Sequence, residues 1–98
     1  MALPLDLEAF VARAYAPDDQ AWALGALASA TAAGGPATDQ MLRCAAMAGR
    51  GTRQGLREML DLLTVDWREV LVAGEYAPTA GGLRRVRDLS GPIPPDSP

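Results

Sequence analysis

The chain has 98 residues, of which 49% are hydrophobic and 21% are charged, and its formal net charge is −3 at pH 7. This length provides for one hydrophobic core, and the composition argues against a disordered chain. The sequence has no histidine, no lysine and a single cysteine, Cys44. An imidazole base, a Ser–His or Cys–His catalytic pair, a cysteine zinc site and an internal disulfide are therefore excluded.

The first ten residues contain two acids and no basic residue, unlike the start of a signal peptide. No stretch approaches the ~18 uninterrupted apolar residues of a membrane span. A lone cysteine fits a reducing compartment. We therefore expect a cytoplasmic protein that does not enter a membrane.

The first predicted helix begins at Asp6 and runs to about Tyr15. Asp6 is of the residue types that cap helix N-termini. Leu5, before the cap, and Phe10, inside the helix, are placed to form a hydrophobic staple.

The second predicted helix follows Pro17 and covers residues 18–33, with two acids in its first turn, where the helix dipole favours them. Gly25 and Ser29 lie one turn apart, and such small residues allow a neighbouring backbone to approach closely. The glycines and proline of segment 34–36 end this helix.

The third predicted helix begins at Thr38 or Asp39 and is closed by Gly49 and Gly51. Thr52 is then placed to cap a fourth helix. The large apolar side chains of that helix follow the i, i+3, i+4, i+7 spacing of an amphipathic helix: Leu56, Met59, Leu60 and Leu63.

The fifth predicted helix has the clearest start. Asp66 and Glu69 have the spacing of a capping box, and Val65 with Val70 has that of the accompanying staple. We expect this helix to end near Gly74.

The composition changes after residue 76. Residues 77–82 predict a loop, and residues 91–98 contain four prolines, which exclude regular structure. The intervening segment 83–89 has apolar residues at every third position, which fits neither a strand nor a helix cleanly. Three interpretations stay open: a short strand pairing back on residues 75–76, a last half-helix, or an arm docked on the helices.

These elements predict a mainly α fold, a compact array of about five short helices with an irregular or partly β-hairpin C-terminal arm. The helical domain covers residues 1–76. The Gly- and Pro-rich arm covers residues 77–98, either as part of the same domain or as a flexible extension.

The sequence holds little catalytic chemistry. Four carboxylates could hold a hard cation in principle: Glu58, Asp61, Asp66 and Glu69. Two of them belong on the solvent side of one helix and two at the start of the next, so we predict no enzyme, no metal site and no cofactor. Cys44 lies between apolar positions and is predicted to be a buried structural thiol, with Arg43 pointing elsewhere.

The methionines allow two interpretations. Met41, Met47 and Met59 either fill the core or line an adaptable groove for a partner helix.

Positive charge is unevenly distributed along the chain. Residues 43–57 carry a balance of +4, whereas residues 1–42 and 58–82 each carry −4. The candidate partner-binding residues are arginines in two groups: Arg50, Arg53 and Arg57 along one edge of the fourth helix, and Arg84, Arg85 and Arg87 in the arm. Such an edge could bind phosphate or an acidic protein surface.

Two functions follow from this edge. A helix, a glycine-containing turn and a helix carrying Arg53 and Arg57 suggest a helix-turn-helix nucleic-acid binder. The acidic net charge and Gly55 inside the would-be recognition helix argue against it, because nucleic-acid-binding domains are typically basic. We therefore predict a small protein–protein interaction module (an adaptor, accessory or regulatory subunit) that binds another protein or itself as a homodimer.

Overall fold

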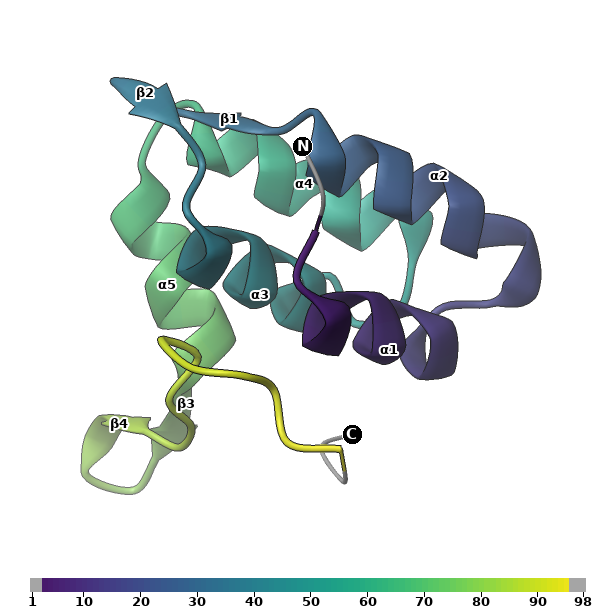
Figure 1. Ribbon diagram of the computed structural model, residues 1–98. Coiled ribbons are helices and arrows are strands. Elements are labelled where there is room, and N and C mark those ends of the chain that lie inside the picture. The colour runs from purple at the N-terminus through teal and green to yellow at the C-terminus, as the bar shows by residue number, and fades with distance from the viewer. Residues whose placement is uncertain (1–2, 96–98) are drawn as a thin grey trace.

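The computed structural model describes residues 3–95, which form five helices and two small antiparallel hairpins (Figure 1). The helices are α1 (Leu5–Ala14), α2 (Pro17–Ala28), α3 (Asp39–Ala48), α4 (Arg53–Leu63) and α5 (Trp67–Glu75). One hairpin pairs β1 (Thr31–Ala32) with β2 (Gly35–Pro36), and the other pairs β3 (Tyr76–Thr79) with β4 (Gly82–Arg85). The prediction of a mainly helical fold is confirmed. None of the described helices is long and apolar enough to cross a membrane.

Helix α3 is the central element of the domain. It packs against α5, α4 and α1, and α2 contacts α1 and α4 (Figure 1). Every residue from 42 to 47 of α3 is buried. The largest fully buried side chains come from all five helices and from the chain after the second hairpin: Leu7, Val11, Leu27, Leu42, Cys44, Leu56, Leu63, Val70 and Leu89. Removal of these side chains from water is the main force that holds the helices together.

The start of α1 differs from the prediction. The helix begins at Leu5, and no side chain caps it. The Asp6 carboxylate instead accepts hydrogen bonds from Arg43 Nε at 2.8 Å and from the Ile93 backbone N–H at 3.0 Å. A guanidinium is a stronger partner for a carboxylate than a neutral amide. Leu5 is 82% exposed, so the predicted staple with Phe10 is also wrong.

Helix α2 ends at Ala28, five residues before the expected end at residue 33. The Ser29 hydroxyl donates back to the Gly25 carbonyl at 2.9 Å, and the chain then turns into the first hairpin. Gly34 has a φ of +86° in that turn, a conformation that glycine adopts readily. The expected close approach to α2 is absent at Gly25, because a Cβ there would have no atom within 4 Å.

The caps of the last three helices are confirmed. Thr38, Thr52 and Asp66 each accept a backbone N–H from the first turn of α3, α4 and α5, at distances of 2.9 to 3.2 Å. Asp66 accepts from the second residue of α5 rather than from Glu69, so the predicted box does not form. Val65 is 77% exposed, and the predicted staple is therefore wrong.

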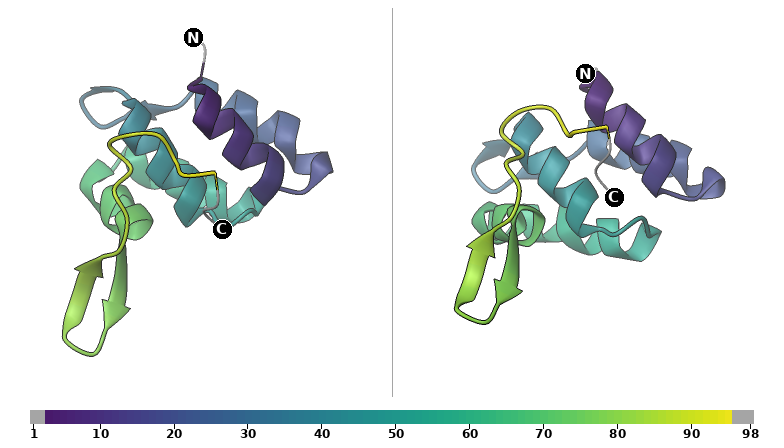
Figure 2. Two further views of the ribbon diagram at one scale, coloured as in Figure 1. Left: turned by 60° about the horizontal axis from the view of Figure 1, so that its bottom comes forward. Right: turned by 90° about the horizontal axis from the view of Figure 1, so that it is seen from below.

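Two of the three interpretations of the C-terminal region hold, each for a different part. The strand interpretation is confirmed by β3 and β4, which pair from Tyr76↔Arg85 to Thr79↔Gly82 and project from the helices (Figure 2). After this hairpin, residues 86–95 return across the helices towards α1. In the structure, the name C-terminal arm is kept for these residues alone, without the hairpin. The arm residues Leu89 and Ile93 are buried in the core, so the arm is docked.

Candidate functional site

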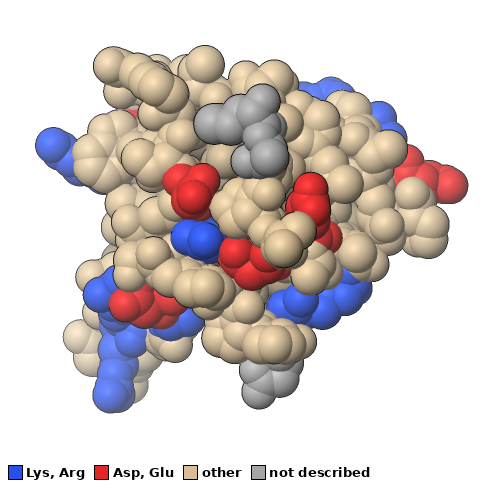
Figure 3. Space-filling model, viewed as in Figure 1, with Lys and Arg blue, Asp and Glu red and all other residues tan. Residues whose placement is uncertain are grey.

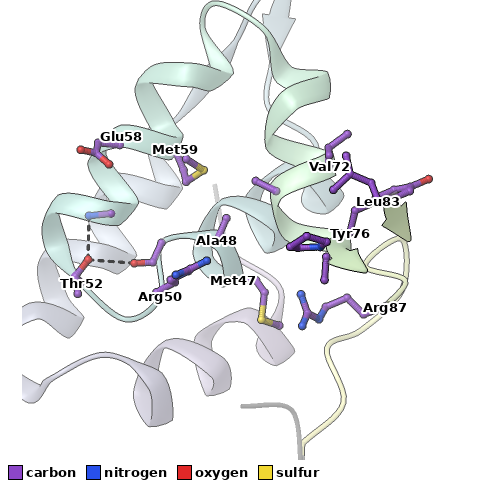
Figure 4. A pocket seen from close by; sticks show the side chains of 15 residues that line it. Met47, Ala48, Arg50, Thr52, Glu58, Met59, Val72, Tyr76, Leu83 and Arg87 are labelled. Carbon is purple, nitrogen blue, oxygen red and sulfur yellow. Dashed lines mark hydrogen bonds between the residues drawn. The ribbon is translucent and has the colours of Figure 1, made fainter. Parts of the chain in front are cut away.

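A groove of about 790 Å³ lies beside the second hairpin, with α4 on one side and α5 and the hairpin on the other (Figure 4). The end of α3 forms its base. Its larger apolar side chains come from three helices and both strands of the hairpin: Met47, Met59, Val72, Tyr76, Pro78 and Leu83. Met47 is buried, Met59 and Val72 are half-buried, and the last three are exposed. The groove therefore offers an apolar floor with walls that a partner can reach.

The base of the groove depends on a close crossing of two helix ends. A Cβ on Gly49 would lie 2.6 Å from the Tyr15 hydroxyl and 2.9 Å from the Leu56 backbone. A Cβ on Gly55 would collide with the Gly49 carbonyl oxygen. Only residues without a Cβ allow the end of α3 and the first turn of α4 to touch here. Gly55 therefore serves helix packing.

Arg50 follows α3 at the base of the groove. It has a φ of +56° and is the only non-glycine residue with a positive φ among residues 3–95. This left-handed conformation costs roughly 1–2 kcal/mol for a residue with a Cβ. Arg50 also lines a second hollow of about 310 Å³ together with Phe10, Ala14 and Met47. Within the described part of the chain, its guanidinium makes no hydrogen bond or ion pair.

Positive charge predominates around the groove. Arg50 and Arg87 line it, and Glu58 is the one acid among its lining residues. The Glu58 carboxylate accepts a hydrogen bond from Gln54 Nε2 at 3.3 Å. The neighbouring hairpin carries the exposed Arg84, and basic side chains gather over this hairpin at the lower left of Figure 3. The basic surroundings of the groove contrast with the net charge of −3 of the whole chain.

The three arginines of the predicted edge do not lie together in the structure. Arg53 Nε donates to Asp19 Oδ1 at 3.1 Å, and the guanidinium groups of Arg53 and Arg57 lie 4.9 and 5.6 Å from the centre of the Trp22 ring. These two arginines therefore fasten α4 to α2. Arg50 is separated from them because it lies in a turn with a left-handed backbone, where helical spacing does not apply.

The three arginines of the hairpin region also have different surroundings. Arg85 Nη2 binds the carboxylates of Glu75 at 3.3 Å and Asp88 at 3.0 Å. Arg87 lines the groove, and its Nη1 donates to the Gly74 carbonyl at 2.7 Å. The structure therefore brings Arg50 and Arg87 of the six predicted residues to one groove.

Cys44 is fully buried, as predicted, and burial raises the pKa of its thiol to about 12. The thiolate that would attack or be oxidised is thus strongly disfavoured. Arg43 was expected to point away from this thiol, and its guanidinium binds the Asp6 carboxylate instead. Among the residues that the structure describes, no three His, Cys, Asp or Glu side chains gather where they could hold a metal ion.

The methionine pattern gave the sequence signal for the apolar lining of the groove. Met47 and Met59 line it, whereas the Met41 sulfur accepts the Thr38 backbone N–H at 3.5 Å. Leu83 could not be found from the sequence, because its place depends on how the hairpin lies against the helices. No protein-family model, curated protein or solved structure matches this chain significantly, so the groove itself must indicate the function.

Proposed function

We propose that this chain is a small cytoplasmic protein–protein interaction module, an adaptor or accessory subunit without catalytic activity of its own. Its groove would hold a segment of the partner. The observation that supports this function is an apolar groove with exposed walls and an arginine without a partner at its base. Binding pockets are typically concave, of about 300–1,000 Å³, and lined mostly by apolar side chains with a few polar groups, and methionines let such a surface adapt to the segment that it binds.

The surroundings of the other arginines favour this function over nucleic-acid binding. A helix-turn-helix protein would need Arg53 and Arg57 free to contact phosphates or bases. Both stack on Trp22, and Arg53 also pairs with Asp19. A phosphate backbone would have to displace these contacts.

The proposal is tested by selecting from a displayed library of random 12-residue peptides. Val72→Arg introduces a long charged side chain into the groove, and Val65→Arg makes the same change at an exposed position outside it. Peptides selected on the wild-type protein are expected to bind Val72→Arg at least about tenfold more weakly, a loss of about 1.4 kcal/mol. They should bind Val65→Arg as they bind the wild type.

Thermal melts of both variants establish that they are folded. If no peptide is enriched, or if the enriched peptides bind both variants equally, the groove is not the interaction site and the proposed function is wrong.

A further inference from the structure

We propose that the groove selects a partner segment in which a carboxylate lies at one end of a short apolar stretch, and that Arg50 binds this carboxylate. The inference rests on the function proposed above and adds the chemistry of the partner. The partner is an acidic segment of another protein rather than a second copy of this chain.

Charge complementarity is the first argument. Two arginines, Arg50 and Arg87, line the groove, and the exposed Arg84 stands on the hairpin beside it. The one acidic residue that lines the groove is Glu58, and its carboxylate already accepts a hydrogen bond from Gln54. A second copy meeting this face around a two-fold axis would bring the same basic groups against each other. A segment with carboxylates would instead neutralise them.

The backbone at Arg50 is the second argument. A glycine adopts a φ of +56° more readily than an arginine does, so Arg50 makes this turn less favourable. The guanidinium makes no hydrogen bond or ion pair within residues 3–95 that would offset this effect. Residues held in sparsely populated backbone conformations cluster at binding sites.

The position of Arg50 determines how the segment would lie. Arg50 and the buried Met47 line both the groove and the smaller hollow next to it, at the end of α3 (Figure 4). The exposed apolar walls, Tyr76 and Leu83, come from the hairpin side. The carboxylate therefore binds at the α3 end, and the apolar side chains extend towards the hairpin. A guanidinium can bind a carboxylate through two parallel hydrogen bonds, which gives the contact its selectivity.

The test compares defined peptides rather than an unknown partner. Each groove-dependent peptide from the library is synthesised with its own carboxylates and again with every Glu and Asp changed to Gln and Asn. Dissociation constants are measured by fluorescence anisotropy on the wild type and on Arg50→Gly. Arg68→Ala, outside the groove on α5, is the matched control.

The amide peptide is expected to bind the wild type about tenfold more weakly than its carboxylate parent, and Arg68→Ala should show the same ratio. On Arg50→Gly the ratio should fall to about one. This variant should melt at the same temperature as the wild type or higher, because glycine relieves the strained turn. Lost selectivity then cannot be attributed to lost folding.

The outcomes separate this inference from the function on which it rests. Groove-dependent peptides that bind equally well as amides would overturn the carboxylate assignment and leave the interaction function standing. A 20-base-pair DNA duplex that binds the wild type at low salt, but not Arg50→Gly, would overturn the assignment of a protein partner. A dimer seen by sedimentation and abolished by Val72→Arg would show that a second copy occupies the groove, which would also overturn it.

Discussion

Two carboxylates, the half-buried Asp6 and the buried Glu75, hold the C-terminal arm through its backbone. Asp6 accepts the Ile93 N–H at 3.0 Å, and Glu75, which is 4% exposed, accepts the Leu89 N–H at 2.7 Å. Each carboxylate also binds a guanidinium, that of Arg43 in the case of Asp6. Carboxylates removed from water need such donors in place of their hydration shell. The position of the arm therefore depends on single charged residues.

Replacing the carboxylate of Asp6 tests this role. The side chains of Asp6 and Arg43 are only 16% and 9% exposed, so Asp6→Asn leaves a nearly buried guanidinium without its counter-charge. We expect the free energy of unfolding in urea to fall by about 2 kcal/mol, less than the full loss of a buried pair because the amide oxygen can still accept a hydrogen bond. Asp61→Asn, at an exposed position of α4, should change it by less than about 0.5 kcal/mol.

The same pair predicts a dependence on pH. The hydrogen bonds from Arg43 hold the pKa of Asp6 below its ordinary value, so the unfolded chain takes up this proton at a higher pH than the folded protein does. The stabilisation is complete above roughly pH 4 and is lost as the pH falls through the folded pKa. Wild-type stability should therefore decline more steeply than that of Asp6→Asn between pH 5 and pH 2. Parallel curves would show that Asp6 is not the titrating group.

At the scale of the helices, the close contact between α3 and α5 allows a test of the packing. A Cβ on Gly74 would lie 2.6 Å from the Cα of Cys44, so α5 lies directly against the backbone of α3. Gly74→Ala must push the two helices apart, and we expect the free energy of unfolding to fall by about 2–3 kcal/mol. Equal stability of this variant and the wild type would show that the helices are not in contact here.

Gly25→Ala is the matched control on α2. A Cβ at Gly25 has no atom within 4 Å, so alanine only improves the helix propensity. The free energy of unfolding should rise by roughly 0.5–1 kcal/mol.

The sequence predicted best those features of the helices that depend on near neighbours. The caps at Thr38, Thr52 and Asp66 were found because a cap and its donor lie within a few residues of each other. The predicted end of α2 lies too late in the sequence. The alanines there permit a longer helix, but the chain forms the first hairpin instead, in which the Ala33 N–H donates to the Leu63 carbonyl. The role of Asp6 was missed, since its partners lie far away in the sequence.

The candidate site was predictable only in part for the same reason. Met47, Met59, Arg50 and Arg87 carried a signal in the sequence, as flexible apolar residues and as unevenly placed charges. Their meeting in one groove depends on how α3, α4 and the hairpin pack, which local patterns do not contain.

Across the whole molecule, the arm completes the hydrophobic core. Leu89 is fully buried and belongs to the same cluster as the buried residues of the five helices. Leu89→Ala would leave a cavity there, and we expect the free energy of unfolding to fall by about 3 kcal/mol. Thermal unfolding followed by far-ultraviolet and tryptophan signals should stay a single transition. A small change in stability, or an early separate transition, would show that the arm is not part of the core.

The arm joins distant parts of the chain, and this has a consequence for the order in which the protein forms. The bond from Ile93 N to Asp6 spans 87 positions, and that from Arg13 to the Pro94 carbonyl spans 81. Closing so long a loop costs more conformational entropy than any contact between neighbouring helices. During synthesis α1 leaves the ribosome long before residue 93 exists. The contacts of α1 with the arm therefore cannot form until residues 93 and 94 have been made.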